Sequence, residues 1–177
     1  ADAPGSYLVA TLDGLDAAAI APAAADRAAA WNTYVAVDDA DVTAAAVIAG
    51  GGTVVSAPAD AGPGGRSATC VDPAGAAFRL WQARRRPGAQ VANAPGAWNF
   101  SDLHTPARDA AMAFYTSVFG WRTVDLGPDA GTMIQVPGYG DHLAGTVDPC
   151  IYERQAGAPP GFADVIGGLA TTRAGEA

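Results

Sequence analysis

The stretch WNTYVAVDDADVTAAAVIAGGGTV, residues 31–54, contains the change from a strand to a helix that decides the fold. Residues 31–39 are rich in Tyr and Val, which favour a strand, whereas residues 40–52 predict a short helix ended by glycines. Three further strands are predicted from TVVSAPAD at 53–60, RSATCVDPAG at 66–75 and AAFRLWQA at 76–83. The order strand, helix, strand, strand, strand is a βαβββ unit.

The same order begins again after the segment RRRPGAQVANAPG. AWNFSDLHT at 97–105 predicts a strand, and PARDAAMAFYTSVFG at 106–120 places apolar residues at helical spacing before a glycine stop. Three more short strands are predicted from WRTVDLG, GTMIQVPG and HLAGTVD. Two copies of one pattern therefore indicate an α+β fold of repeated βαβββ units with mixed sheets.

Both ends of the chain match only parts of such a unit, so we expect incomplete terminal units. SYLVATLDGLDAAAIAP predicts a hairpin that turns at Asp13 and Gly14. The final residues are rich in Gly and Pro and have no clear period. The predicted parts are a first domain at 1–83 with a partial and a complete unit, a linker at 84–97, a third unit at 98–149, and a tail or linker to a further unit at 150–177.

Composition limits the partners and the compartment. The formal net charge is −8, whereas a nucleic-acid-binding protein normally presents a broad positive face, so we expect no nucleic-acid partner. The longest apolar stretch is interrupted by Pro22, Asp26 and Arg27, so no membrane partner is predicted. Cys70 and Cys150 lack the spacing of a metal site, and no signal peptide is visible. These features favour reduced thiols in a cytoplasmic protein.

Three stretches carry a resemblance to a known family: AFYTSVFGW at 113–121, DPAGAAFRLWQ at 72–82, and the stretch at 31–54. They resemble the vicinal oxygen chelate superfamily, which includes glyoxalase I, the bleomycin-resistance proteins and the extradiol dioxygenases. The pattern is most similar to actinobacterial two-domain glyoxalase-like proteins. The resemblance implies βαβββ units whose curled sheets share a cup, which commonly holds a divalent metal on His, Gln or Glu.

Strand alternation predicts which side chains of the first unit line this cup, because alternate residues face the same side. It turns Asn32 and Tyr34 into the cup from one strand, and Arg79 and Trp81 from another. The family's metal ligands would fall at Asn32, a poor ligand, and at Arg79, which offers only donors. Alternatively, Arg79 would cover the exposed side of an edge strand, and Trp81 would only pack.

In the second unit the same alternation turns Phe100, Asp102 and His104 into the cup, with Phe100 at the ligand position. Asp102 and His104 are the candidate catalytic residues, because a carboxylate and an imidazole can bind a metal or move protons. His104 has the alternative role of ending the strand before Pro106. None of the projected positions holds a good ligand, so the sequence predicts no metal site.

Two functions stay open from the sequence. The first is a binding protein whose metal-free cup holds a small organic molecule, with Arg79 receiving an anionic or carbonyl group. The alternative is a glyoxalase-like lyase or isomerase that acts on a small carbonyl compound with a divalent metal. A fragment or degenerate relative without activity is a third interpretation, so the sequence does not decide whether the protein is an enzyme. The ligand-binding candidates are Asn32, Tyr34, Arg79, Trp81 and Phe100.

We also expect a homodimer. The unit that begins at Trp98 has no complete partner unit within the chain, so its concave sheet would be exposed. A second copy of the chain would cover that sheet.

Overall fold

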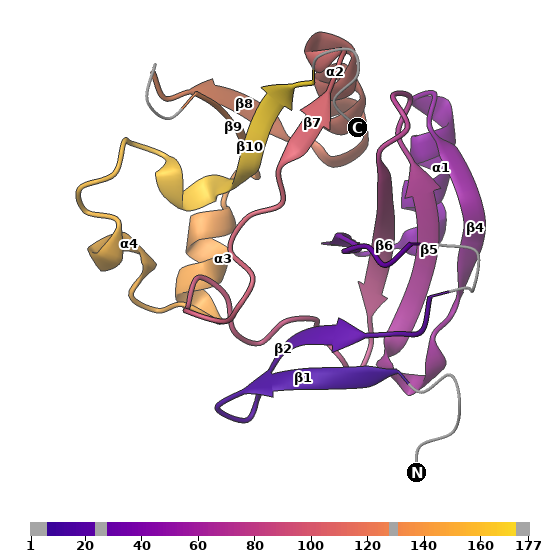
Figure 1. Cartoon of the computed structure of the whole chain (residues 1–177), viewed down its shortest axis with the longest axis horizontal. Helices are drawn as coiled ribbons and strands as arrows, with labels where there is room; N and C mark the ends of the chain where they lie inside the picture. The colour runs from indigo at the N-terminus through magenta and orange to yellow at the C-terminus, as the bar shows by residue number, and fades with distance from the viewer. Residues whose placement is uncertain (1–6, 24–27, 128–130, 173–177) are drawn as a thin grey trace.

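The computed structural model describes residues 7–23, 28–127 and 131–172. The strands within these residues form a two-stranded hairpin and two four-stranded sheets. Figure 1 shows the two larger sheets on opposite sides of the molecule, with α2 at the top and the hairpin along the bottom. The structure is therefore the expected α+β fold with mixed sheets.

The first four-stranded sheet confirms the predicted βαβββ unit. Its elements are β3 (Tyr34–Ala36), α1 (Ala40–Ala49), β4 (Thr53–Asp60), β5 (Gly65–Val71) and β6 (Ala77–Ala83), with a 3₁₀ turn, η1 (Gly62–Gly64), between β4 and β5. The strand order is β3-β6-β5-β4, with β3 parallel to β6 and the other pairs antiparallel. The first and last strands of the unit therefore lie side by side.

Helix α1 begins where the sequence supplies a cap. The Asp39 carboxylate accepts hydrogen bonds from the backbone N–H groups of Asp41 and Val42, each at 2.9 Å. These bonds satisfy two of the free donors of the first helical turn. Gly50 ends the helix and Gly51, with φ of 88°, turns the chain into β4.

The second four-stranded sheet repeats this topology. Its elements are β7 (Leu103–Thr105), α2 (Arg108–Phe119), β8 (Arg122–Asp125), β9 (Thr132–Gln135), α3 (Tyr139–Gly145), α4 (Ile151–Arg154), a 3₁₀ turn, η2 (Phe162–Asp164), and β10 (Val165–Thr171). The order is β7-β10-β9-β8, with β7 parallel to β10. Helix α2 ends at Gly120 in a left-handed conformation, as the sequence predicts.

The fourth strand of this unit is not where the sequence placed it. The prediction of a strand at 142–148 is wrong, because these residues lie in α3 and the turn after it. Gly140 and Leu143 are buried at helical spacing, and the Asp164 carboxylate accepts the Gly140 N–H at 2.8 Å. The fourth strand is β10, within the segment expected to be a tail. The unit therefore continues to Thr171, past the expected boundary at residue 149.

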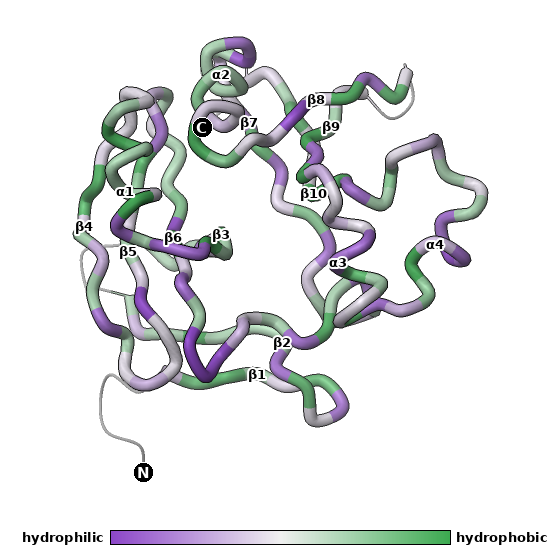
Figure 2. The backbone as a smooth tube through the Cα atoms, turned by 180° about the vertical axis from the view of Figure 1, so that it is seen from behind, coloured by the Kyte–Doolittle hydropathy of each residue, from purple (hydrophilic) through white to green (hydrophobic). Residues whose placement is uncertain are grey.

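The predicted N-terminal hairpin is confirmed. Strands β1 (Leu8–Leu12) and β2 (Leu15–Ile20) are joined at Asp13 and Gly14, both with positive φ. Figure 2 shows β1 largely in the colour of hydrophobic residues. The linker holds this hairpin: Gln90 N–H donates to Asp16 O at 2.7 Å, and Asp16 N–H donates to Gln90 Oε1 at 3.0 Å.

One hydrophobic core joins the two units. Its buried members come from α1, β5, β6 and α2: Ala44, Val47, Ala68, Cys70, Phe78, Leu80, Ala111, Phe114 and Tyr115. Helix α2 of the second unit thus packs against the sheet and helix of the first. Apolar burial of this kind is the main stabilising contribution to such a contact.

Two hydrogen bonds also join the units. The buried Tyr115 hydroxyl donates to Asp72 at 3.1 Å, and the Thr33 hydroxyl donates to the Ser101 hydroxyl at 3.2 Å. Burial and the Asp72 carboxylate raise the pKa of Tyr115. The second unit therefore contacts the first through α2 and these two bonds, and the homodimer that would cover its concave sheet stays a prediction. None of the helices in the described ranges has the length and apolar character needed to cross a membrane.

Candidate functional site

Four of the predicted site residues meet on β6, on β3 and just before β3. Arg79 Nε donates to Asn32 Oδ1, and Arg79 Nη1 donates to the Tyr34 hydroxyl, both at 3.3 Å. The Arg79 guanidinium carbon lies 5.5 Å from the centre of the Tyr34 ring, within the range of a cation–π contact. The Trp81 ring meets Tyr34 edge-on, with centroids 6.3 Å apart. We call Asn32, Tyr34, Arg79 and Trp81 the Arg79 cluster.

The alternation of β6 separates this cluster from the core. Phe78 and Leu80 are 5% and 0% exposed and pack beneath the helices. Arg79 and Trp81 are partly buried and lie on the other side of the strand. The parallel register places Tyr34 directly opposite Arg79, so their contact follows from the pairing of the first and last strands.

The Arg79 guanidinium has neutral partners. The amide oxygen of Asn32 and the hydroxyl of Tyr34 accept two of its N–H groups. None of the salt bridges among the described residues involves Arg79. A guanidinium carries five N–H donors in a planar fork that matches a carboxylate. The cluster can therefore donate hydrogen bonds to an anionic or carbonyl oxygen.

Sequence reasoning missed Tyr7, which precedes β1. Burial raises the pKa of its phenol, and the nearby Tyr34 adds to the increase, while Arg86 and Arg79 oppose it. The charges of the Arg79 cluster thus act on Tyr7, which is 57% exposed and 27 positions before Tyr34 in the sequence. No local pattern indicates this neighbourhood, because it depends on how the hairpin packs.

Sequence reasoning also assigned Arg86 only to a linker. Trp81 Nε1 donates to the Arg86 backbone oxygen at 2.9 Å, which fixes Arg86 beside the cluster. Arg86 Nε lies 3.7 Å from Asp16 Oδ2 on β2. The run of three arginines marked this segment as charged, but its position follows from the Trp81 contact.

The predicted residues of the second unit make different contacts. Phe100 meets Phe162 edge-on at 6.1 Å. Asp102 Oδ1 accepts the Gly168 N–H at 2.6 Å. His104 is exposed on β7, and the described part of the chain contains no hydrogen bond between it and Asp102. Asp102 therefore holds β10, and its catalytic role with His104 stays a prediction.

The divalent metal that the resemblance implies does not fit the Arg79 cluster. The Asn32 amide oxygen, its best donor to a metal, already accepts from Arg79. The adjacent guanidinium would repel a cation and cannot ligate it. Residues 7–23, 28–127 and 131–172 also contain no group of three His, Cys, Asp or Glu side chains placed to hold a metal ion.

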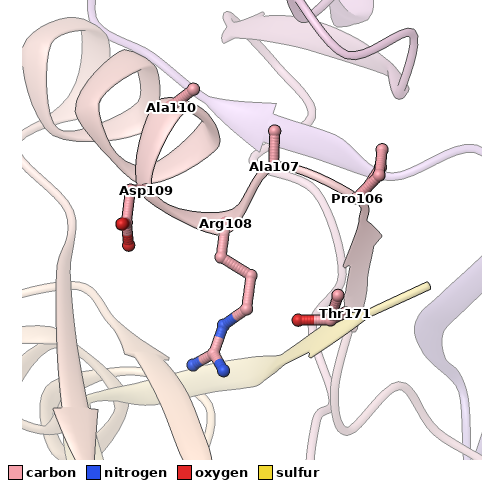
Figure 3. A pocket seen from close by; sticks show the side chains of 6 residues that line it. All are labelled: Pro106, Ala107, Arg108, Asp109, Ala110 and Thr171. Carbon is pink, nitrogen blue, oxygen red and sulfur yellow. The ribbon is translucent and has the colours of Figure 1, made fainter. Parts of the chain in front are cut away.

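Two surface depressions lie away from the cluster. The first surrounds the start of α2, where the Arg108 side chain extends from the helix (Figure 3). The second lies near α4 and η2 and is lined by Tyr152, Gln155 and Phe162 among others. Neither is lined by a member of the Arg79 cluster.

Comparison with known proteins gives long matches to mycobacterial sequences. The chain is 40% identical over 150 residues to "Putative glyoxylase CFP32" of Mycobacterium tuberculosis and of Mycobacterium bovis. The match covers 82% of this chain and 58% of each relative. The chain belongs to the vicinal oxygen chelate superfamily.

Other proteins match over shorter stretches. The chain is 39% identical over 99 residues to "Anthracycline biosynthesis protein DnrV" of Streptomyces peucetius, covering 56% of this chain and 36% of that protein. A Mn(II)-bound glyoxalase from Novosphingobium aromaticivorans is a structural neighbour with a TM-score of 0.45 and 26% identity, covering 57% of this chain and 36% of that one. No protein-family profile matches the chain. The chain thus spans less than two thirds of the length of each of these relatives.

Proposed function

We propose that the Arg79 cluster binds a small organic molecule through an anionic or carbonyl oxygen. Arg79 would supply the positive charge that a metal commonly supplies in this superfamily. The observation that supports this proposal is the Arg79 guanidinium, which among the described residues has two neutral acceptors, Asn32 and Tyr34, and no salt-bridge partner. A guanidinium without a salt-bridge partner can form charge-assisted hydrogen bonds with an anion, so such a site favours an anionic ligand.

The aromatic members of the cluster favour a ligand with an organic body. Tyr34 and Trp81 present rings beside the guanidinium. Rings of this kind offer apolar contact area as well as a polar edge. The names of the relatives, a glyoxylase and anthracycline biosynthesis proteins, also refer to organic compounds. A 2-oxo acid combines a carboxylate with a neighbouring carbonyl and is the simplest probe of this chemistry.

Calorimetric titration with pyruvate and phenylglyoxylate, in the presence of EDTA, tests the proposal. We expect both to bind, phenylglyoxylate more tightly because its ring can contact Tyr34 and Trp81. Arg79→Gln should weaken binding at least about tenfold, since a hydrogen bond to a charged group contributes roughly 1.5–3 kcal/mol. Arg122→Gln, an exposed change on β8, is the matched control. Absence of binding by the parent protein, or binding only with added divalent metal, would contradict the proposal.

The name of the mycobacterial relatives favours an alternative function, a glyoxalase-like lyase or isomerase that uses a divalent metal. Asp102 and His104 would then act on a small carbonyl compound. The test is turnover of a 2-oxoaldehyde with a thiol, with and without added divalent metal. Turnover that Asp102→Ala abolishes would support this alternative and displace the binding function.

We further propose a homodimer and a cytoplasmic location. Leu8, Leu15 and Ile20 of the hairpin are 50%, 44% and 65% exposed, and a second copy of the chain would cover them. Both cysteines are free thiols, which suits a reducing compartment. Light scattering at micromolar concentration should give the mass of a dimer, and the mass of a monomer would contradict that part of the proposal.

A further inference from the structure

We propose that Arg86 is a second anion-binding residue beside the Arg79 cluster, and that Asp16 competes with the ligand for it. The inference rests on the proposed function, because it extends the same site to molecules with two anionic ends. It assigns a role to Arg86 in the linker and to Asp16 on β2. The sequence analysis expected no ligand-binding residue in either segment.

The position of Arg86 supports this assignment. Its backbone oxygen accepts the Trp81 indole N–H at 2.9 Å, and its backbone N–H donates to Gly64 O at 3.1 Å. A Cβ built on Gly64 would lie 3.5 Å from Arg86 Cβ and 3.7 Å from the Trp81 ring. Arg86 is therefore held against the same Trp81 ring that meets Tyr34.

The partner of Arg86 is weakly engaged. The 3.7 Å between Arg86 Nε and Asp16 Oδ2 is a charge contact that is too long for a hydrogen bond. The side chains of Arg86 and Asp16 are 46% and 25% exposed. An exposed pair of this kind contributes little to stability, and its guanidinium donors stay available to another anion.

Asp16 is nevertheless fixed in place. Gln90 binds both its backbone N–H and its backbone oxygen, at 3.0 and 2.7 Å. These bonds keep the Asp16 backbone beside the linker, so its carboxylate stays within reach of Arg86. A ligand carboxylate must compete with this fixed charge.

Trp81 connects the two arginines. Its indole N–H holds the Arg86 backbone oxygen at 2.9 Å, and it lies on the same side of β6 as Arg79, so both residues lie beside one ring. Two guanidiniums on one side of a molecule favour a dianion over a monoanion, because each can form a charge-assisted hydrogen bond. A dicarboxylate whose first end binds Arg79 would reach Arg86 with its second end.

Calorimetry with 2-oxoglutarate and pyruvate tests the inference, because the two share a 2-oxo acid end and differ in the second carboxylate. We expect the parent protein to bind 2-oxoglutarate about tenfold more tightly than pyruvate. Arg86→Gln should abolish this preference and change pyruvate binding less than twofold. Arg84→Gln is the matched control, since Arg84 belongs to the same linker but pairs with Asp60 at 2.8 Å.

The aspartates give a second matched pair. Asp16→Asn should tighten 2-oxoglutarate binding several-fold, whereas Asp60→Asn, which removes the same charge, should leave it unchanged. Equal affinity for both acids in the parent protein, or a preference that survives Arg86→Gln, would overturn the inference while the proposed function stands. If pyruvate itself does not bind, the proposed function fails first.

Discussion

The two βαβββ units share one topology but build different surfaces from it. Val35 lies opposite Leu80 in the first unit, and Leu103 lies opposite Leu169 in the second. Aligning these apolar pairs places Gly168 at the position of Arg79, so the second unit has no side chain where the first has a guanidinium.

The hydrogen bonds at this position differ accordingly. In the first unit the Arg79 side chain donates to Tyr34, and in the second the Gly168 backbone N–H donates to Asp102. The Arg79 guanidinium has further N–H donors besides the one that binds Tyr34. The Asp102 carboxylate instead joins the segment before β7 to β10. The same position thus carries a guanidinium in the first unit and a backbone hydrogen bond that holds β10 in the second.

The same alignment pairs Phe78 with Gly167. Phe78 fills its place with a ring that meets Phe114, Tyr115 and Phe119. At Gly167 the backbone of Ser101 occupies the space, and an added Cβ would lie 2.1 Å from the Ser101 oxygen. The second unit therefore requires glycine where the first requires a large apolar side chain.

Gly167→Val should break the second unit and gives the largest expected effect. The added side chain cannot fit beside the Ser101 backbone, so β10 must move away from the segment before β7. We expect a loss of about 3 kcal/mol in the free energy of unfolding, measured by urea denaturation. Gly157→Ala, with nothing within 4 Å of the added Cβ, is the control. Unchanged stability of Gly167→Val would contradict the close approach of the Ser101 backbone to Gly167.

Tyr115→Phe tests the contact that joins the units. It removes a buried hydrogen bond to Asp72 and should cost about 1–2 kcal/mol. Because the folded-state pKa of Tyr115 is raised, its contribution is complete below the unfolded value near 10 and is lost as the pH rises above it. Urea denaturation from pH 8 to 11 should show a steeper loss of stability in the parent protein than in the variant. Parallel curves would count against this linkage.

Asp102→Ala should lower stability by about 1 kcal/mol, because the Gly168 N–H loses its acceptor. Asp102→Asn keeps an oxygen at that place and should cost less. Neither change should alter pyruvate binding, because Asp102 lies in the second unit and its carboxylate holds β10. Loss of binding with full stability would instead assign Asp102 to the ligand site.

Arg79→Gln should have the smallest effect on folding, a change within about 0.5 kcal/mol, although it has the largest expected effect on binding. The side chain lies outside the core and its partners are partly exposed. Thermal denaturation of the variant checks this expectation. A large drop in stability would mean that the first unit also uses this position for structure.

The sequence predicted the first unit better than the second for a physical reason. Alternation in β6 is carried by large residues, so the faces of Phe78 and Arg79 follow from the pattern. In β10 the pair Gly167 and Gly168 offers no side chains, which leaves no period to detect. Tyr7 and Arg86 were missed because their neighbourhood depends on contacts between distant segments, such as that of Asp16 with Gln90.

The most direct measurement of the central claim is a crystal structure of the protein with phenylglyoxylate, grown in the presence of EDTA. The account predicts the carboxylate within about 3 Å of the Arg79 guanidinium nitrogens, with the phenyl ring against Tyr34 or Trp81. A ligand bound elsewhere, or an Arg79 side chain turned into the core with no ligand beside it, would contradict the account.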